Sequence, residues 1–258
     1  MDDNIKLLEN YSVLAEIYDD VMSDVDYETW TDYIDEIILT HNPETHDVLE
    51  LACGTGTMAL SLEELDCYNI TATDASSHMI RIARQKGDEV ESAVHFQTMN
   101  FLNLNFDQKF DVVFMVFDSI NYLHNPSDII DLHNEVKQVL KPGGIFIYDF
   151  TTPRNSRKAI RFLNNEQKKI NEFYRYRRNS SYNPNKRIHT NQFYIEKTDQ
   201  SGGSVVETYH EEHQQKIYTL SEIETLVSKT DFKILERYDG FELKPAHSKS
   251  LRITMVLQ

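Results

Sequence analysis

The chain has 258 residues, 40% hydrophobic and 11% aromatic, enough for the core of one large α/β domain or of a domain with an insertion. Its formal net charge of −16 disfavours a general nucleic-acid-binding protein, because phosphate contacts need Lys and Arg. With no apolar leader, no run long enough to span a bilayer and only Cys53 and Cys67 as cysteines, we expect a cytoplasmic protein with free thiols and no membrane contact.

Residues 1–40 are expected to be helical, because apolar residues recur every three or four positions from Leu7 to Tyr18 and again from Trp30 to Ile38. From residue 47 to residue 150, short apolar runs alternate with helical segments, which predicts βαβ units and a parallel sheet. The expected strands are 48–51, 70–73, 94–97, 112–117 and 145–150, and the expected helices are 57–65, 77–86 and 127–140.

After Phe150 the alternation stops. A basic segment expected to be helical runs to about Arg178, and a hairpin is expected from 192–198 and 205–217 around a turn at 200–203. A capping box at Thr219 predicts a helix to about Thr230. Runs 233–238 and 251–257 would close the main sheet.

The predicted fold class is therefore α/β, with a doubly wound, mostly parallel, seven-stranded Rossmann-like sheet and an antiparallel β-rich insertion. Three regions are expected along the chain: a helical lid plus the cofactor-binding core at 1–150, a substrate-side insertion at 151–218, and the last helix and closing strands at 219–258.

The basic segment 154–187 contains eleven Lys or Arg and two acids, so it carries +9 while the rest of the chain carries −25. One interpretation is a solvated helical cover, which is what most charge runs form. The other is a contact surface for an anionic substrate or RNA.

The most informative segment is 48–57, VLELACGTGT, in which an apolar strand leads into a loop of small residues and then a helix. Ala52, Gly54 and Gly56 allow a tight turn and the close approach of a ligand. Asp74 lies 20 residues beyond Gly54, at the end of the next expected strand, where a carboxylate can accept hydrogen bonds from ribose hydroxyls. Together these features predict an adenosine-type ligand. The spacing also fits G-x-G-x-x-A, so a nicotinamide-dependent dehydrogenase stays open at this point.

Residues 50–56, ELACGTG, resemble the first signature of class I S-adenosylmethionine-dependent methyltransferases. The resemblance extends through 74–79, 100–101, 110–118 and 140–144, and covers about residues 10–150 well and 209–258 more loosely. Segments 11–19 and 211–219 further resemble the small-molecule branch, which includes amine and sugar N-methyltransferases. The resemblance implies S-adenosylmethionine as cofactor, S-adenosylhomocysteine as product, and a small polar acceptor, with nitrogen favoured over oxygen.

The resemblance also implies roles for individual residues. Glu50 would contact the methionine amino group and Asp74 would hold the ribose, while Asn100, where many members have Asp, would lie at the adenine edge. The other residues implied to contact the cofactor belong to the lid or the glycine loop, or would lie at the adenine or methionine end of the cofactor: Tyr11, Tyr18, Trp30, Ala52, Cys53, Gly54, Thr55, Gly56, Ala75, Met79, Phe101, Phe117 and Asp118.

A general base is needed if the acceptor carries a proton, and the candidates are His124 and His213, with Tyr122 as a substrate-positioning hydroxyl. Either histidine is alternatively a surface or capping residue. The histidine spacing gives no metal-ligand pattern, so we expect no metal. The alternatives to a small-molecule enzyme are an RNA-modifying methyltransferase that uses 154–187, the dehydrogenase, and a non-catalytic binder. We expect a monomer or homodimer.

Overall fold

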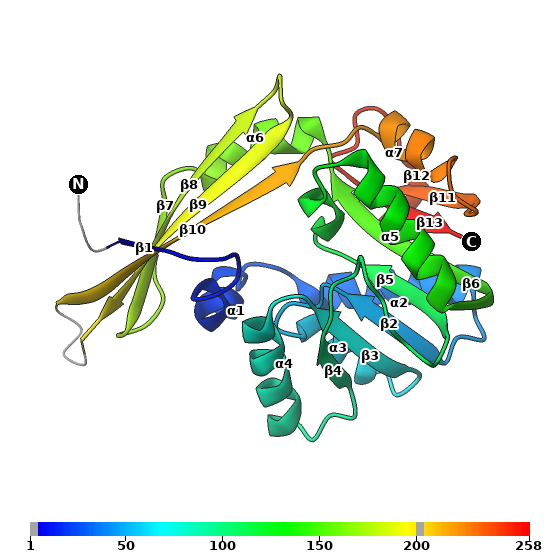
Figure 1. Cartoon of the computed structure of the whole chain (residues 1–258), viewed down its shortest axis with the longest axis horizontal. Coiled ribbons are helices and arrows are strands. Elements are labelled where there is room, and N and C mark those ends of the chain that lie inside the picture. Colours follow the sequence, from blue (N-terminus) through cyan, green and yellow to red (C-terminus); the bar gives the residue numbers. More distant parts are fainter. Residues whose placement is uncertain (1–4, 200–203) are drawn as a thin grey trace.

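The structure, a computed structural model, describes residues 5–199 and 204–258 and contains two β-sheets (Figure 1). The strands of the larger sheet are β2 (Asp47–Leu51), β3 (Asn69–Asp74), β4 (His95–Thr98), β5 (Phe110–Met115), β6 (Leu140–Thr151), β11 (Ile234–Asp239), β12 (Glu242–Pro245) and β13 (Arg252–Leu257). Their order across the sheet is β12-β11-β13-β6-β5-β2-β3-β4. Strands β2 to β6 are mutually parallel, and β13 lies antiparallel between β6 and β11. The predicted Rossmann-like class is confirmed, with β12 as an eighth, short edge strand that the prediction of seven missed.

The order of the strands reverses at β2, because β3 and β4 extend the sheet on one side of it and β5 and β6 on the other. In open α/β sheets, the crevice beyond the carboxyl ends of the strands at such a reversal is where ligands bind. The loops that follow β2, β3 and β5 therefore meet at one place.

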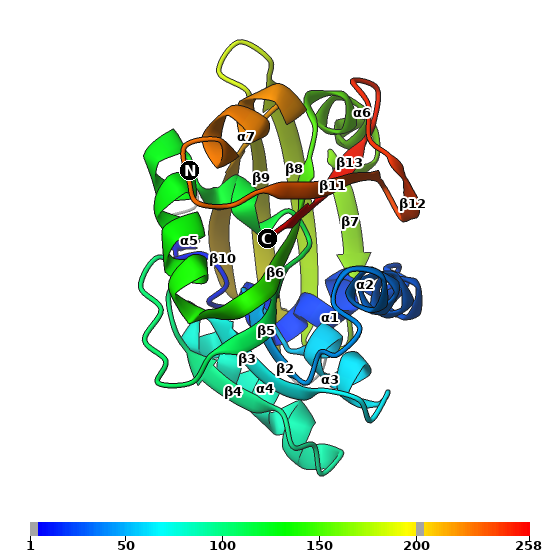
Figure 2. The same cartoon turned by 90° about the vertical axis from the view of Figure 1, so that its right-hand side faces the viewer.

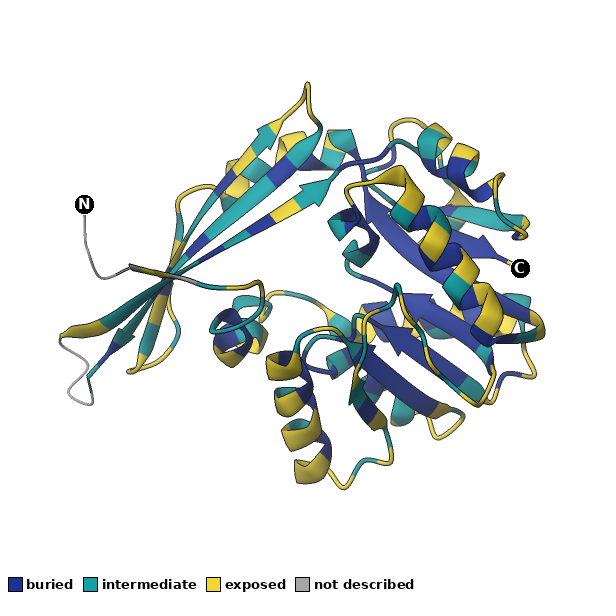
Figure 3. Ribbon diagram, viewed as in Figure 1, coloured by how far each residue is buried: buried dark blue, intermediate teal, exposed yellow. Residues whose placement is uncertain are grey.

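Helices cover both faces of the larger sheet, as the dark blue strands beneath partly exposed helices in Figure 3 show. Alternate residues of β5 face opposite ways: Val112 and Phe114 join one core cluster, and Val113 and Met115 the other. In residues 5–199 and 204–258, no helix is both long and apolar enough to cross a bilayer. The helices are α1 (Tyr18–Val21), α2 (Tyr27–His41), α3 (Thr57–Glu63), α4 (Ser77–Glu89), α5 (Pro126–Val139), α6 (Pro153–Leu163) and α7 (Leu220–Val227), with 3₁₀ turns η1 (Leu14–Ile17) and η2 (Ser119–Tyr122).

The smaller sheet has the order β1-β10-β9-β8-β7, and all its pairs are antiparallel except that of β1 with β10. Figure 1 shows it to one side of the larger sheet, and in Figure 2 its long strands lie behind β6 and α7. The strands are β1 (Ile5–Leu7), β7 (Glu166–Lys169), β8 (Tyr174–Asn183), β9 (Ile188–Thr198) and β10 (Val205–Lys216). The predicted hairpin of β9 and β10 is confirmed, and so is the capping box of Thr219 and Glu222 that begins α7. The expected turn at 200–203 lies outside the described residues.

Two helix predictions are wrong. The basic segment is helical only in α6, and β7 and β8 replace the expected helix up to Arg178. Tyr174 and Tyr176 alternate with Arg175 and Arg177, a two-residue period that fits a strand, and pairing with β9 outweighs the local charge pattern. Residues 5–7 form β1 through backbone pairing with β10, so only short helical turns remain in the first expected helix.

We expect Gly56→Ala to lower the free energy of unfolding by about 3 kcal/mol, from left-handed backbone strain and overpacking together. Gly56 has φ +77°, and an added Cβ would lie 2.6 Å from Phe96 Cε1. Gly143→Ala is the matched control, because Gly143 has φ +83° with nothing within 4 Å of an added Cβ. It should cost only about 1 kcal/mol. Equal losses in urea unfolding would contradict the close packing on Phe96.

Candidate active site

Asp74 joins the two loops at the reversal point. Its Oδ2 accepts a hydrogen bond of 2.9 Å from the Gly54 N–H, and its Oδ1 accepts one of 2.8 Å from the Ser76 N–H. The glycine loop can take this course because Ala52 and Gly54 have φ +55°. Burial raises the pKa of Asp74, and the two N–H donors oppose that rise. Each carboxylate oxygen keeps a second lone pair for a ligand hydroxyl.

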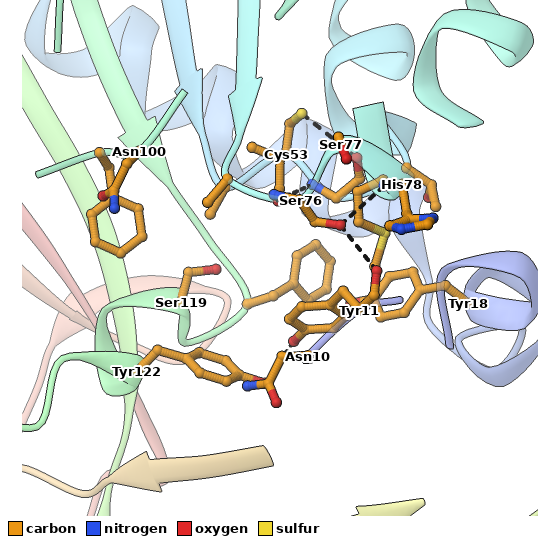
Figure 4. Close-up of a pocket in the computed structure, with 18 of the residues that line it drawn as sticks. Asn10, Tyr11, Tyr18, Cys53, Ser76, Ser77, His78, Asn100, Ser119 and Tyr122 are labelled. Carbon is orange, nitrogen blue, oxygen red and sulfur yellow. Dashed lines mark hydrogen bonds between the residues drawn. The ribbon is translucent and has the colours of Figure 1, made fainter. Parts of the chain in front are cut away.

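A cavity of about 730 Å³ lies over these loops, and Figure 4 shows Asn100 and Tyr18 toward opposite ends of it. That volume is within the range of cofactor sites. The structure thus brings together most of the predicted cofactor residues. Those that line this cavity are Tyr11, Tyr18, Glu50, Ala52, Cys53, Gly54, Thr55, Asp74, Ala75, Met79, Asn100, Phe101 and Phe117, together with Tyr122.

The surroundings of the Glu50 carboxyl indicate whether the cavity suits a ligand with an amino group. Its side chain is 2% exposed, and Oε2 has no hydrogen-bond partner in the described protein. Burial, with a contribution from Asp74, raises the pKa of this carboxyl well above its usual value. A buried oxygen without a partner is costly unless a ligand satisfies it, and an ammonium would do so. The residues therefore fit a ligand that carries an amino group and a ribose.

Cys53 also lines the cavity, but its thiol is buried, and burial raises its pKa well above the ordinary value. A neutral thiol is a weak nucleophile. The structure therefore supports a packing role for Cys53 beside the loop.

Some of the predicted site residues do not line the first cavity. Trp30 and Asp118 do not line the first cavity but a second one, where Trp30 packs on Phe117 at 4.5 Å between ring centroids. Gly56 lines neither cavity, because its Cα packs against Phe96. His124 is exposed and lines neither cavity; its Nε2 lies 3.0 Å from the Gln214 carbonyl oxygen, so it is a surface residue.

The second cavity, of about 440 Å³, lies between the smaller sheet and the end of β5. Four aromatic residues line both cavities: Tyr11, Tyr18, Phe117 and Tyr122. They lie where the two cavities adjoin, and we call these four residues the shared wall. Of the two candidate bases, His213 lines the second cavity and is 2% exposed.

An ion cluster that the sequence analysis missed lies at one side of the second cavity. Arg252 pairs with Asp118 at 2.6 Å and with Asp149, and the Asp118 N–H donates to Asp149. Burial raises the pKa of Asp149, although Arg252 opposes the rise. Gln215 of β10 donates to Asp118 at 2.6 Å, so the cluster ties the smaller sheet to the larger one. This pairing explains why Asp118 is turned away from the first cavity.

The lid, which we define as residues 8–26, covers the cofactor loops. Ser76 Oγ donates to the Tyr11 carbonyl oxygen at 2.9 Å. Asp19 accepts from the Thr55 hydroxyl and pairs with Lys86 at 2.8 Å. The lid is therefore attached to the loops after both β2 and β3.

Comparison with known proteins agrees with this geometry. Residues 48–144 match the methyltransferase-domain family Methyltransf_25. The putative methyltransferase YqeM of Bacillus subtilis (strain 168) is 27% identical over 224 residues, which cover 87% of each chain. A crystal structure of an S-adenosylmethionine-dependent methyltransferase from Clostridium acetobutylicum ATCC 824 shares 27% identity with a TM-score of 0.78, covering 96% of this chain and 98% of that one. Residues 48–144 are therefore a methyltransferase domain, and the chain has the class I S-adenosylmethionine-dependent methyltransferase fold.

A more distant structure shares the fold of this methyltransferase. CalS10 from Micromonospora echinaspora, an amino pentose methyltransferase solved with S-adenosylmethionine bound, has a TM-score of 0.69 at 14% identity, over 95% of this chain and 96% of that one. The predicted class and cofactor are confirmed by these comparisons. The dehydrogenase that the glycine spacing left open finds no support among these proteins.

We expect S-adenosylhomocysteine binding to release protons, because burial raises the pKa of Glu50 and pairing with an ammonium lowers that pKa again. The affinity for S-adenosylhomocysteine is therefore lower at pH values below the pKa of Glu50, and it increases as the pH rises through that pKa. Calorimetry in two buffers of different ionisation enthalpy measures the release. Glu50→Gln should reduce it and weaken binding about tenfold; a residual release from Asp74 is expected because burial raises its pKa too.

Glu64→Gln is the matched control, since Glu64 is an exposed carboxylate just after α3 and lines neither cavity. It should leave affinity and proton release unchanged. Binding to the wild-type protein with no dependence on the buffer would contradict the role given to Glu50.

Proposed function

We propose that this methyltransferase transfers the methyl group of S-adenosylmethionine to an amine nitrogen of a small polar molecule held in the second cavity. The observation that supports this most is the shared wall, which puts an acceptor cavity directly beside the cofactor cavity. A displacement at carbon needs nucleophile, methyl carbon and leaving sulfur in line, so adjacent cavities suit it.

The proposed place of the cofactor follows from the first cavity. Asp74 would hold the ribose and Glu50 the methionine amino group. Asn100 would meet the adenine edge; its Oδ1 already accepts from the Leu102 N–H at 2.9 Å, which fixes the side chain and leaves its amide donors available.

The chemistry of the second cavity favours an amine. The charged residues that line the cavity are Asp118, Arg178 and Arg252. Arg252 pairs with Asp118 and Asp149, and Arg178 pairs with Glu166, so the lining and its ion-pair partners together hold three carboxylates for two guanidiniums. An excess of carboxylate attracts a cation. Trp30 and Phe193 each already have an arginine over the ring, Arg252 at 5.4 Å and Arg178 at 5.5 Å from the centroid, so the aromatic faces offered to an alkylammonium are those of the shared wall.

The fold neighbours agree with an amine acceptor. CalS10 is described as an amino pentose methyltransferase and KedS8 as a sugar N-methyltransferase. Each shares 14% identity with this chain, so the similarity supports the fold alone. The argument for an amine acceptor rests on the chemistry of the second cavity.

When bound, S-adenosylmethionine supplies a methyl group that its sulfonium already activates. The residues of this chain align the acceptor, exclude water and remove a proton. The shared wall is aromatic and keeps water from the transfer path. His213 is the proposed base, and Tyr122, whose hydroxyl lies 3.1 Å from His213 Nδ1, is the proposed positioning hydroxyl. Burial raises the pKa of Tyr122, so its phenol stays neutral and acts as a hydrogen-bond donor.

RNA is the alternative acceptor, and the basic segment 154–187 gives little support for RNA binding. Arg175 pairs with Glu196, Arg178 with Glu166 and Arg187 with Glu222. Lys168 donates to the Asp20 carbonyl oxygen and to Ser23 of the lid. Cations that already have partners inside the protein contribute less to phosphate binding, which favours a structural role for this segment.

The test is a panel of small amines, amino sugars included, each with its hydroxyl analogue, and of RNA, assayed with methyl-labelled S-adenosylmethionine and mass spectrometry. We expect the label on an amine. With that amine, His213→Ala should lower turnover about a hundredfold or more, the usual contribution of a general base. His124→Ala, the matched control at the surface, should leave turnover within about twofold. Label found only on hydroxyl analogues or only on RNA would contradict the proposal.

A further inference from the structure

Glu211 is a carboxylate of β10 for which the sequence analysis predicted no role. Its side chain is fully buried, at 0% exposure. Its Oε2 accepts the Tyr11 N–H at 2.7 Å and its Oε1 accepts the Leu14 N–H at 2.8 Å. Both donors belong to the lid, about 200 residues earlier in the chain. Glu211 therefore fastens the lid to the smaller sheet.

The same carboxylate begins a hydrogen-bonded circuit. His213, two residues along β10, has Nε2 at 3.4 Å from Glu211 Oε2 and Nδ1 at 3.1 Å from the Tyr122 hydroxyl. The Tyr122 hydroxyl lies 2.6 Å from the Tyr11 hydroxyl. The circuit thus starts at the backbone N–H of Tyr11 and returns to its phenol.

The chemistry of the members fixes the direction of these hydrogen bonds. An ionised carboxylate only accepts, so in neutral His213 the Nε2 atom carries the proton and Nδ1 is the acceptor. Tyr122 then donates to Nδ1, and Tyr11 donates to Tyr122. The Tyr11 oxygen keeps free lone pairs, and Tyr11 and Tyr122 are both part of the shared wall.

We propose that Glu211 is a positioning residue for methyl transfer: it closes the lid over the methyl donor and, by selecting the His213 tautomer, orients Tyr122 and Tyr11 to receive the proton that the acceptor amine gives up. This inference rests on the proposed amine acceptor for its proton. Lid closure and readiness of the base then depend on one carboxylate, so the relay is complete only when the lid is shut.

The proton and electron movements balance. An acceptor ammonium passes a proton to the Tyr11 oxygen while Tyr11 passes its own to Tyr122 and Tyr122 passes its own to His213 Nδ1. The freed amine lone pair forms the new N–C bond as the C–S bond breaks, and the electrons of that bond stay on sulfur. The imidazolium that results lies beside the Glu211 carboxylate, which stabilises its charge.

The groups that face His213 come from several elements. Tyr11 of the lid lies at 4.6 Å and Phe193 of β9 at 5.5 Å between ring centroids, and Tyr122 is in η2. Arg178, Asp118, Arg252 and His189 line the same cavity. Within hydrogen-bond distance of the ring, the described residues offer only Glu211 and Tyr122.

The test uses the full-length protein with S-adenosylhomocysteine and needs no acceptor. Nitrogen-15 NMR at pH 8 reports the His213 tautomer, with the His213→Gln spectrum to assign the signal. We expect the Nε2–H form in the wild type. In Glu211→Gln, an amide cannot accept both lid N–H groups and the imidazole N–H, so the Nδ1–H form should appear. Affinity for S-adenosylhomocysteine by calorimetry should fall about tenfold.

Glu212→Gln is the matched control, because Glu212 is the next residue of β10, points to the opposite face and bonds Gln192 and Gln214 instead. It should keep the tautomer, and affinity within about twofold. An Nδ1–H tautomer in the wild type overturns the proposal, whether or not Glu211→Gln folds. So does a weakened affinity with no change of tautomer, which is what a purely structural latch would give. If no amine in the panel is methylated, the His213 tautomer and the affinity for S-adenosylhomocysteine would still be as expected. The two proposals can therefore fail separately.

Discussion

The attachment of two backbone N–H groups to the Asp74 carboxylate is the constraint on which the site depends. Gly54 follows β2 and Ser76 follows β3, so one side chain fixes the loops after both strands at the point where the sheet order reverses. Glu50 of β2 lines the same cavity, and its Oε2 has no hydrogen-bond partner among the residues that the structure describes. Two buried carboxylates of raised pKa are costly in an empty pocket, and a ligand with a ribose and an ammonium compensates both.

The rest of the molecule organises what surrounds that pocket. The lid is held at one end by the cofactor loops, through Ser76 and Thr55, and at the other by Glu211 of the smaller sheet. The smaller sheet is held to the core through Gln215 and the Arg252 cluster. The loops after β2 and β3, the lid and the residues around the second cavity are therefore parts of one connected hydrogen-bonded structure, and the shared wall lies where they meet.

Local sequence was sufficient for the core and for most of the first cavity. Apolar runs, the small residues before Gly56 and the acid at position 74 are signals within short windows, and they predicted the strands and the loops that line the first cavity. The misses depend on distant partners. Nothing near Glu211 shows that it bonds N–H groups 200 residues away, and Asp118 turns from the first cavity because Arg252 attracts it. The alternation of Tyr and Arg in β8 has the two-residue period of a strand, but the positive charge of the segment led to the prediction of a helix.

Direct titration with S-adenosylhomocysteine tests the central claim, with wild-type protein beside Asp74→Ala and the exposed control Asp231→Ala. We expect saturable binding to the wild type and to Asp231→Ala. In Asp74→Ala the loss of two hydrogen bonds to a charged group should cost about 2–3 kcal/mol of binding free energy. Equal affinity in all three proteins, or no binding to the wild type, would contradict the account of this site.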